Sequence, residues 1–387
     1  MLNPALAPFG GFDKKSSLQL EDWNHNRIIT IDLECRTINN VMTPYAVGIY
    51  DGTIFTSFYL ADFKDIEEMI TAAVNYLIQV EFHKKYVYLH NFSGFDSHFL
   101  LKYLLALSSA NILYPTIRGD KLISLTVPFK VGKEVIEITF LDSLNLLPHS
   151  LAKLGVAFGV EVQKGIFPYE LVNNPNINLN YIGPVPGFNM FNKVSENVYN
   201  DYSNGFVDDW NLKSETLKYL EGDCVSLYQI LTSFGNLIFS NYKTDITTTH
   251  TLPSLSLKIY RNIFMSTKNI PIINGTLYNT LSQAFYGGIV DIYLPYGEDL
   301  HYYDVNSLYP FAMKKPIPVG SPVYTNISDE INLDTFFGFI RAKIVCPHDL
   351  HIPVLPVKNN GGRDYCVPSY GILGRVVFFG RIKKRTR

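Results

Sequence analysis

The chain has 387 residues, of which 47% are hydrophobic, 14% are aromatic and 18% are charged, and its formal net charge at neutral pH is −2. This length and apolar content are sufficient for two or three domains, each with a buried core. The near-neutral balance excludes a globally basic surface, so nucleic-acid binding would depend on local groups of Lys, Arg and aromatic side chains.

The four cysteines lie far apart, at positions 35, 224, 346 and 366. Because they form no CxxC pair, they indicate neither a zinc site nor a disulfide framework, and they fit a reducing compartment. No uncharged apolar run reaches about 18 residues, so we expect no membrane partner. The amino terminus lacks the Arg-rich amphipathic pattern of a transit peptide. If the protein works in an organelle, we therefore expect it to be synthesised inside that organelle.

The first 90 residues predict a mixed sheet. Residues 27–35, 44–50 and 53–60 have the composition of strands, and Asp51-Gly52 predicts a hairpin turn between the last two. We expect Asp62 to cap a helix whose apolar positions continue to Leu77. A further strand at 86–89 completes a pattern typical of the ribonuclease-H-like α/β fold.

The first strand carries two acidic residues. In the stretch RIITIDLEC at 27–35, a β-branched run leads into Asp32 and Glu34. Since side chains alternate along a strand, both carboxylates point to the same face. Two such charges at ~4 Å repel by roughly 1–4 kcal/mol, so a divalent cation is expected between them. The alternative is the polar edge of a sheet.

Asp96 follows a Gly-containing loop and precedes a helix that we expect to end near Ser108. It is either a simple helix cap or a third carboxylate at the end of a central strand, where α/β sheets place their ligand sites. Residues 122–128 and 134–141 predict another strand pair. The Asn-, Pro- and Gly-rich stretch 165–212 is interpreted as a surface insertion.

A helix beginning at Ser214 places Tyr219 and Asp223 four residues apart, and therefore on one face. The alternative is a hydrogen-bonded tyrosine beside a solvated aspartate. We expect residues 243–251 to form a linker to a second unit, which includes a strand at 338–345.

These residues together resemble the exonuclease motifs of family B DNA polymerases, in the family's order: Asp32 with Glu34, Asn91 to Asp96, and Tyr219 with Asp223. The heptad DVNSLYP at 304–310 resembles polymerase motif A of the same family. Ser143, Leu144 and Lys164 resemble elements of the protein-primed subgroup, as does FYGG at 285–288, where Phe285 replaces the first Tyr of a Tyr-x-Gly-Gly motif. The overall likeness is greatest to polymerases of fungal mitochondrial linear plasmids.

The resemblance implies a ribonuclease-H-like 3′–5′ exonuclease domain at 1–240 and a partial polymerase palm at 241–387. It implies two Mg²⁺ or Mn²⁺ ions per active site, since hard cations prefer oxygen ligands. Their ligands in the exonuclease site would be Asp32, Glu34, Asp96 and Asp223. Tyr219, whose ordinary pKa is about 10, would orient the attacking water, and Lys164 would offset phosphate charge.

The resemblance also assigns residues to DNA and nucleotide. A single-stranded 3′ end would be held by Asn91, Phe95, Ser143 and Leu144, with Phe95 stacking on a base. In motif A, Asp304 would bind a metal ion and Tyr309 would lie under the sugar of the incoming dNTP, beside Ser307 and Leu308. Primer-template DNA would pass Tyr286, Gly287 and Gly288, and a terminal protein would act as primer.

The sequence departs from the family pattern after Asp304. No Asp-Thr-Asp sequence follows, the Lys/Tyr helix that grips the triphosphate is missing, and the resemblance fades near 371–374. The expectation is the amino-terminal part of a mitochondrial polymerase, cut short by a frameshift or gene degradation and unable to extend a primed template alone. The alternatives are a non-catalytic remnant that binds nucleic acid or a primer protein, and a product that never accumulates.

Overall fold

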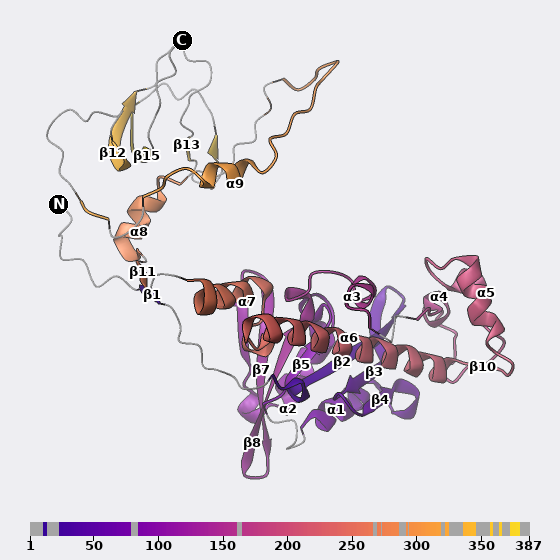
Figure 1. Cartoon of the computed structure of the whole chain (residues 1–387). Coiled ribbons are helices and arrows are strands. Elements are labelled where there is room, and N and C mark those ends of the chain that lie inside the picture. The colour runs from indigo at the N-terminus through magenta and orange to yellow at the C-terminus, as the bar shows by residue number, and fades with distance from the viewer. Residues whose placement is uncertain are drawn as a thin grey trace. The chain divides into compact units, whose positions relative to one another are not determined.

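The computed structural model describes residues 11–13, 23–78, 84–160, 165–265, 269–271, 273–285, 292, 294–318, 322–324, 336–345, 357–358, 364–365 and 372–379. These residues group into two compact units, one within 15–265 and the other formed by residues before 15 and after 265. Figure 1 shows the elements of both units.

A seven-stranded mixed sheet forms the centre of the larger unit, in the spatial order β4-β3-β2-β5-β8-β7-β6. The strands are β2 (Ile28–Ile38), β3 (Val41–Tyr50), β4 (Phe55–Tyr59), β5 (Tyr86–Leu89), β6 (Tyr114–Arg118), β7 (Lys121–Val131) and β8 (Glu134–Asp142). β2, β5 and β8 are parallel to one another, and the other neighbours pair antiparallel. The predicted mixed α/β sheet is therefore confirmed, and the carboxyl ends of its parallel strands meet at one edge.

Helices cover both faces of this sheet. They are α1 (Ile66–Leu77), α2 (Ser97–Leu107), α3 (Leu151–Phe158), α6 (Leu212–Tyr242) and α7 (Leu252–Ile259). α1 and α2 bury one apolar cluster that includes Ile29 and Ile31 of β2. α3 and α6 bury a second that includes Ile28 of the same strand. The period-two alternation of β2 thus separates two cores, and the long α6 crosses one face of the sheet (Figure 1).

Residues 165–212 do not form a mere surface insertion, as the sequence suggested. They contain α4 (Tyr169–Val172), β9 (Ile182–Gly183), α5 (Glu196–Asn204) and β10 (Trp210–Asn211). Phe167, Val172 and Trp210 are buried with Tyr45 and Tyr59 of the sheet in a third apolar cluster. The segment packs because its aromatic side chains, spread among Asn and Pro residues, bury large areas.

Two predicted helix starts are wrong in detail. Asp65, not Asp62, caps α1 by accepting the Glu68 N–H, while Asp62 forms an ion pair with Lys213. α6 begins at Leu212, two residues before Ser214, because the Asn211 side chain caps it.

The predicted linker at 243–251 is also packed. Thr244, Asp245, Ile246 and Thr247 in this stretch are buried. Asp245 accepts hydrogen bonds from the Trp23 indole and from Thr247.

The strand and turn predictions agree more closely with the structure. The hairpin at Asp51-Gly52 is confirmed, with Gly52 at φ +99° and Asp51 accepting two backbone N–H groups. In the second unit the strand predicted at 338–345 is confirmed as β12 (Gly338–Val345). The other elements there are β1 (Gly11–Asp13), β11 (Asn269–Pro271), α8 (Gly275–Ser282), α9 (Leu308–Met313), β13 (Val357–Lys358), β14 (Asp364–Tyr365) and β15 (Ile372–Phe379).

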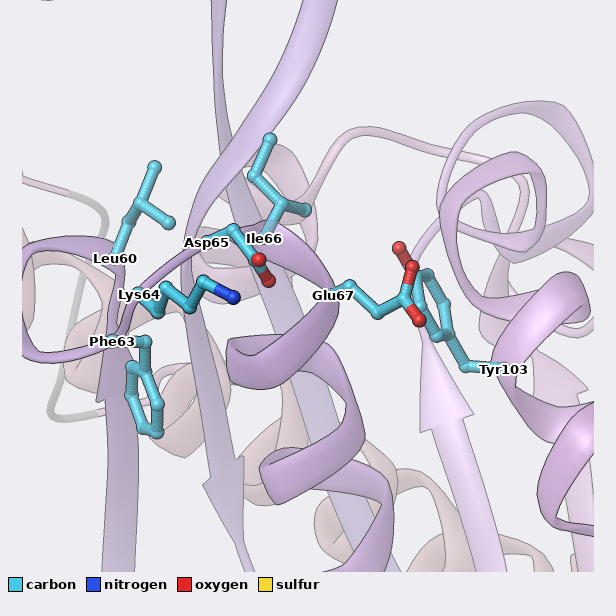
Figure 2. Close-up of a pocket in the computed structure, with 7 residues that line it drawn as sticks. All are labelled: Leu60, Phe63, Lys64, Asp65, Ile66, Glu67 and Tyr103. Carbon is cyan, nitrogen blue, oxygen red and sulfur yellow. The ribbon is translucent and has the colours of Figure 1, made fainter.

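An open cavity of about 510 Å³ lies at the amino end of α1 (Figure 2). It is lined by Leu60, Phe63, Lys64, Asp65, Ile66, Glu67 and Tyr103. None of the predicted site residues that the structure describes lines it. In the part of the chain that the structure describes, no helix is both long and apolar enough to span a bilayer.

Candidate metal and nucleic-acid site

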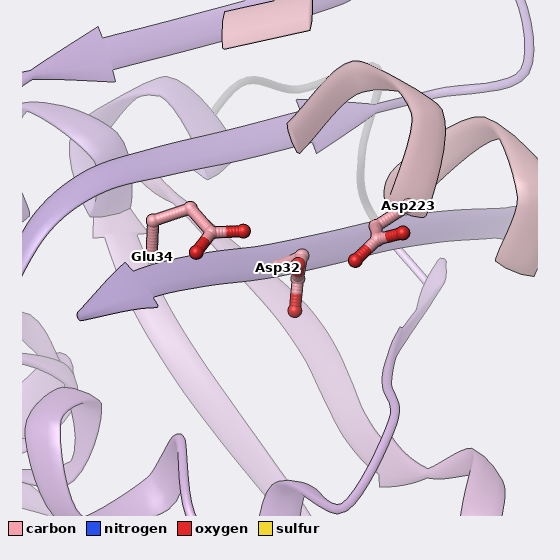
Figure 3. Close-up of side chains that lie close together, drawn as sticks. All are labelled: Asp32, Glu34 and Asp223. Atoms are coloured by element: carbon pink, nitrogen blue, oxygen red, sulfur yellow. The ribbon is translucent and has the colours of Figure 1, made fainter. Parts of the chain in front are cut away.

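Three of the predicted metal ligands come together in space. Asp32 and Glu34 project from β2, and Asp223 projects from α6 (Figure 3). One carboxylate oxygen from each residue lies within 4.8 Å of the others. Glu34 and Asp223 are buried and Asp32 is half-buried. This all-oxygen donor set suits a hard divalent cation, which would relieve the repulsion between the carboxylates.

Close packing of α6 on the sheet brings Asp223 to β2. Thr30 Oγ1 donates to the Cys224 carbonyl at 2.8 Å, and Cys224 Sγ lies 3.5 Å from the Gly48 carbonyl oxygen. Gly48 pairs with Asp32 across the β2–β3 ladder. A Cβ at Gly48 would lie only 2.7 Å from Cγ of Leu220 on α6, so glycine permits this approach.

Asp96, the fourth predicted ligand, is not one of the three members of this acidic group. It occupies the N-cap position of α2, yet its side chain makes no capping hydrogen bond. It is 2% exposed, and its Oδ1 has no hydrogen-bond partner among the residues that the structure describes. Burial, followed by the charge of Asp142, raises the pKa of Asp96 to about 7. Burial raises the pKa of the Cys35 thiol, and the charges of Asp96, Glu34 and Asp32 raise it further.

Tyr219 stands one helical turn before Asp223 and is buried. Its hydroxyl lies 2.8 Å from the hydroxyl of Tyr169, and its ring packs against Phe167. Burial, then the charges of Asp223 and Glu34, raise the pKa of Tyr219, so the phenol stays protonated. No role was predicted for Tyr169, because it lies in the segment interpreted as an insertion.

The four residues assigned to single-stranded DNA lie after two neighbouring parallel strands. Asn91, at φ +75°, and Phe95 follow β5, while Ser143 and Leu144 follow β8. Phe95 is half-buried, and its ring packs edge-on against the ring of Phe99 with 5.4 Å between the ring centroids. Ser143 is fully buried and its Oγ donates to the Leu89 carbonyl at 3.2 Å.

Four other predicted site residues lie outside the described part of the chain: Lys164, Tyr286, Gly287 and Gly288. Asp304, Ser307, Leu308 and Tyr309 belong to the second unit and are exposed. Ser307 has φ +55° and precedes α9. Among the described residues, Asp304 is in no cluster of three or more potential metal ligands.

Comparison with protein families gives one match over most of the chain. Residues 78–382 match the model of DNA polymerase type B, organellar and viral. A "Probable DNA polymerase" of Ascobolus immersus is 36% identical over 352 residues, covering 88% of this chain and 29% of the relative. A "Probable DNA polymerase" of Neurospora intermedia is 33% identical over 383 residues, covering 90% of this chain and 39% of the relative. The chain therefore spans about a third of the length of these relatives.

Solved structures show the same fold. Phi29 DNA polymerase in complex with primer-template DNA and incoming nucleotide is 18% identical and has a TM-score of 0.59. The match covers 90% of this chain and 56% of that one. At this level of identity, the likeness concerns the fold alone.

Proposed function

The chain belongs to the organellar and viral type B DNA polymerases, and from that premise we propose that its larger unit is a divalent-metal-dependent 3′–5′ exonuclease acting on single-stranded DNA. The meeting of Asp32, Glu34 and Asp223 carries the proposal. The three carboxylates come from β2 and from α6, which are far apart in sequence, and a bound cation would relieve the repulsion between them.

The described residues fit the chemistry of phosphodiester hydrolysis. Asp32, Glu34 and Asp223 would hold the metal, with Asp96 as a further ligand, and Mg²⁺ or Mn²⁺ would supply an activated water and neutralise the leaving oxygen. Tyr219, as a neutral phenol, would orient the water by hydrogen bonding.

Substrate binding would use neighbouring residues. Phe95 would stack on a base of the frayed 3′ end, a contact worth about 1–3 kcal/mol. Asn91, Ser143 and Leu144 would line the strand, and Lys164 would offset phosphate charge.

For the second unit we propose the motif A part of a polymerase centre. Asp304 would bind metal, and Tyr309, beside Ser307 and Leu308, would lie under the sugar of a dNTP. Tyr286, Gly287 and Gly288 would approach the template, because glycine allows close backbone contact. We propose that the whole protein is a protein-primed polymerase that replicates a mitochondrial plasmid or its integrated copy, with primer-template DNA and a terminal protein as partners. The names of the fungal relatives and the primer-template DNA bound in the Phi29 complex support the polymerase part of this proposal.

The exonuclease proposal is tested with a 5′-labelled single-stranded oligonucleotide and Mg²⁺ or Mn²⁺. The wild type should shorten the oligonucleotide from its 3′ end, and Asp32→Ala with Glu34→Ala should slow this on the order of 100-fold or more, since changes even behind the metal ligands cost 10–100-fold. Asp120→Asn, in an exposed turn between β6 and β7, is the matched control. Equal digestion by the acidic-site variant and the wild type would rule out this site.

The same experiment separates the second candidate, a non-catalytic module that binds nucleic acid. That module would bind the oligonucleotide without shortening it. Its affinity would fall steeply with salt if phosphate contacts dominate.

A further inference from the structure

Asp142 is a buried carboxylate that the proposed chemistry does not use. It is the last residue of β8 and is 2% exposed. Its two oxygens accept four hydrogen bonds. Oδ1 accepts the backbone N–H groups of Asn91 and Leu144, both at 3.0 Å. Oδ2 accepts the backbone N–H of Ser93 at 3.1 Å and its hydroxyl at 2.7 Å.

These bonds join two segments that are not neighbours in sequence. Residues 91–95 follow β5, and residues 143–145 follow β8, the adjacent parallel strand. Leu89 and Asp142 are paired at the ends of these strands. The side chain of Asp142 thus reaches across the edge of the sheet and fixes the backbone of both segments at once.

The two segments carry the residues assigned above to the 3′ end of a single strand. Asn91, whose N–H is bound by Asp142, has a left-handed backbone that non-glycine residues seldom adopt. Leu144 is held through its own N–H by the same carboxylate oxygen. We infer that Asp142 is a positioning residue that sets the spacing between these two segments, and hence the width of the path for single-stranded DNA. This inference rests on the proposed exonuclease function.

A carboxylate suits this role better than an amide. It presents only acceptors, and all four of its partners are donors. In Asp142→Asn, the amide nitrogen would face either the backbone N–H groups of Asn91 and Leu144 or the backbone N–H and hydroxyl of Ser93. At least one backbone N–H would then lose its acceptor, and the segment that carries it would shift.

The test compares Asp142→Asn with Ser93→Ala and with the exposed control Asp120→Asn. Ser93→Ala removes only the hydroxyl bond and leaves the three backbone bonds, so it keeps the inference testable if Asp142→Asn folds poorly. Steady-state digestion of a labelled oligonucleotide with Mn²⁺ gives KM and kcat. Fluorescence anisotropy in the presence of a chelator gives oligonucleotide affinity without cleavage.

We expect Asp142→Asn to raise KM and weaken oligonucleotide binding about tenfold, which corresponds to about 1.4 kcal/mol. Its kcat should change less than twofold, which distinguishes it from a metal ligand. Ser93→Ala should weaken binding about two- to threefold. Asp120→Asn should match the wild type.

The outcomes separate the two proposals. If the wild type digests DNA and Asp142→Asn keeps wild-type KM and affinity, this inference is wrong and the exonuclease function stands. If the wild type binds but does not digest, the exonuclease proposal fails, and tenfold weaker binding by Asp142→Asn still supports the inference. A wild type that neither binds nor digests the oligonucleotide overturns both. A loss in kcat alone for Asp142→Asn also overturns the inference.

Discussion

Gly48 offers a direct test of how the acidic site is held together. In Gly48→Ala the new Cβ would lie 2.7 Å from Cγ of Leu220 and 2.8 Å from Cε2 of Phe55, distances that real Cβ contacts do not reach. Leu220 is fully buried and stands on the same face of α6 as Asp223. The helix would have to move away from β3, and Asp223 would move with it.

Two magnitudes follow from this clash. Overpacking a core by one methyl group costs about 1–3 kcal/mol, and each 1 kcal/mol lowers the melting temperature by roughly 2–4 °C for a unit of this size. A displacement of about 1 Å at a reacting centre costs on the order of 100-fold in rate. We therefore expect Gly48→Ala to have a lower melting temperature and a nuclease rate about 10- to 100-fold slower than the wild type.

The assay is thermal unfolding followed by digestion of the labelled oligonucleotide. Gly155→Ala on α3 is the matched control, since its new Cβ would meet Val160 only at an ordinary 3.4 Å. Combining Gly48→Ala with Leu220→Ala removes one side of the clash. The double variant should therefore lose about 1–3 kcal/mol less stability than the sum of the losses in the two single variants. The contact with Phe55 remains, so relief is partial. Wild-type melting and rate in Gly48→Ala, or strictly additive losses in the double variant, would refute this reasoning.

Three further predictions concern the same region. Mg²⁺ or Mn²⁺ should raise the melting temperature of the wild type, and a chelator should reverse the gain; a gain of equal size in Asp32→Asn with Glu34→Gln would contradict a metal role for these residues. Because the pKa of Asp96 in the folded protein is raised to about 7, the metal-free wild type should lose stability relative to Asp96→Asn as the pH rises from about 4 to 7. Urea unfolding should show a loss of about 2–4 kcal/mol over this range. A stability difference that does not depend on pH would contradict this prediction. Thr30→Val should lower the urea midpoint by the equivalent of about 0.5–1.5 kcal/mol, because it removes the bond to the Cys224 carbonyl, and an unchanged midpoint would show that this bond contributes nothing.

Local patterns predicted the parts of the fold that local physics determines. The hairpin at Asp51-Gly52 and the strand at 338–345 follow from turn chemistry and β-branched composition, which act over a few residues. The cap of α1 was assigned to Asp62 because Phe63 was counted as the first apolar position of the helix, whereas the helix begins at Ile66 after Asp65. Asp62 instead binds Lys213, far along the chain. No local pattern records such a contact.

Long-range packing explains what the sequence did not reveal about the site. Asp142 was passed over in favour of Ser143 and Leu144, although an acidic residue at the end of a strand is itself a signal in a parallel sheet. Its four partners become visible only when β5 and β8 are placed side by side. Tyr169 was missed for the same reason, because its partner Tyr219 lies on α6, beyond the whole segment 165–212.

The alternation of β2 links the stability of the fold to the position of the acidic group. Ile29, Ile31 and Leu33 face one apolar core, and Thr30, Asp32 and Glu34 face α6. A slip of one residue in register would turn the carboxylates into the first core and the isoleucines toward α6, so burial of the apolar residues enforces the orientation of the acidic ones. The pairing shifts between Glu34 and Cys35, immediately after the last carboxylate. The core therefore holds Asp32 and Glu34 together against their mutual repulsion, and Asp223 depends in addition on the approach of α6, which is why Gly48 is the more informative position to change.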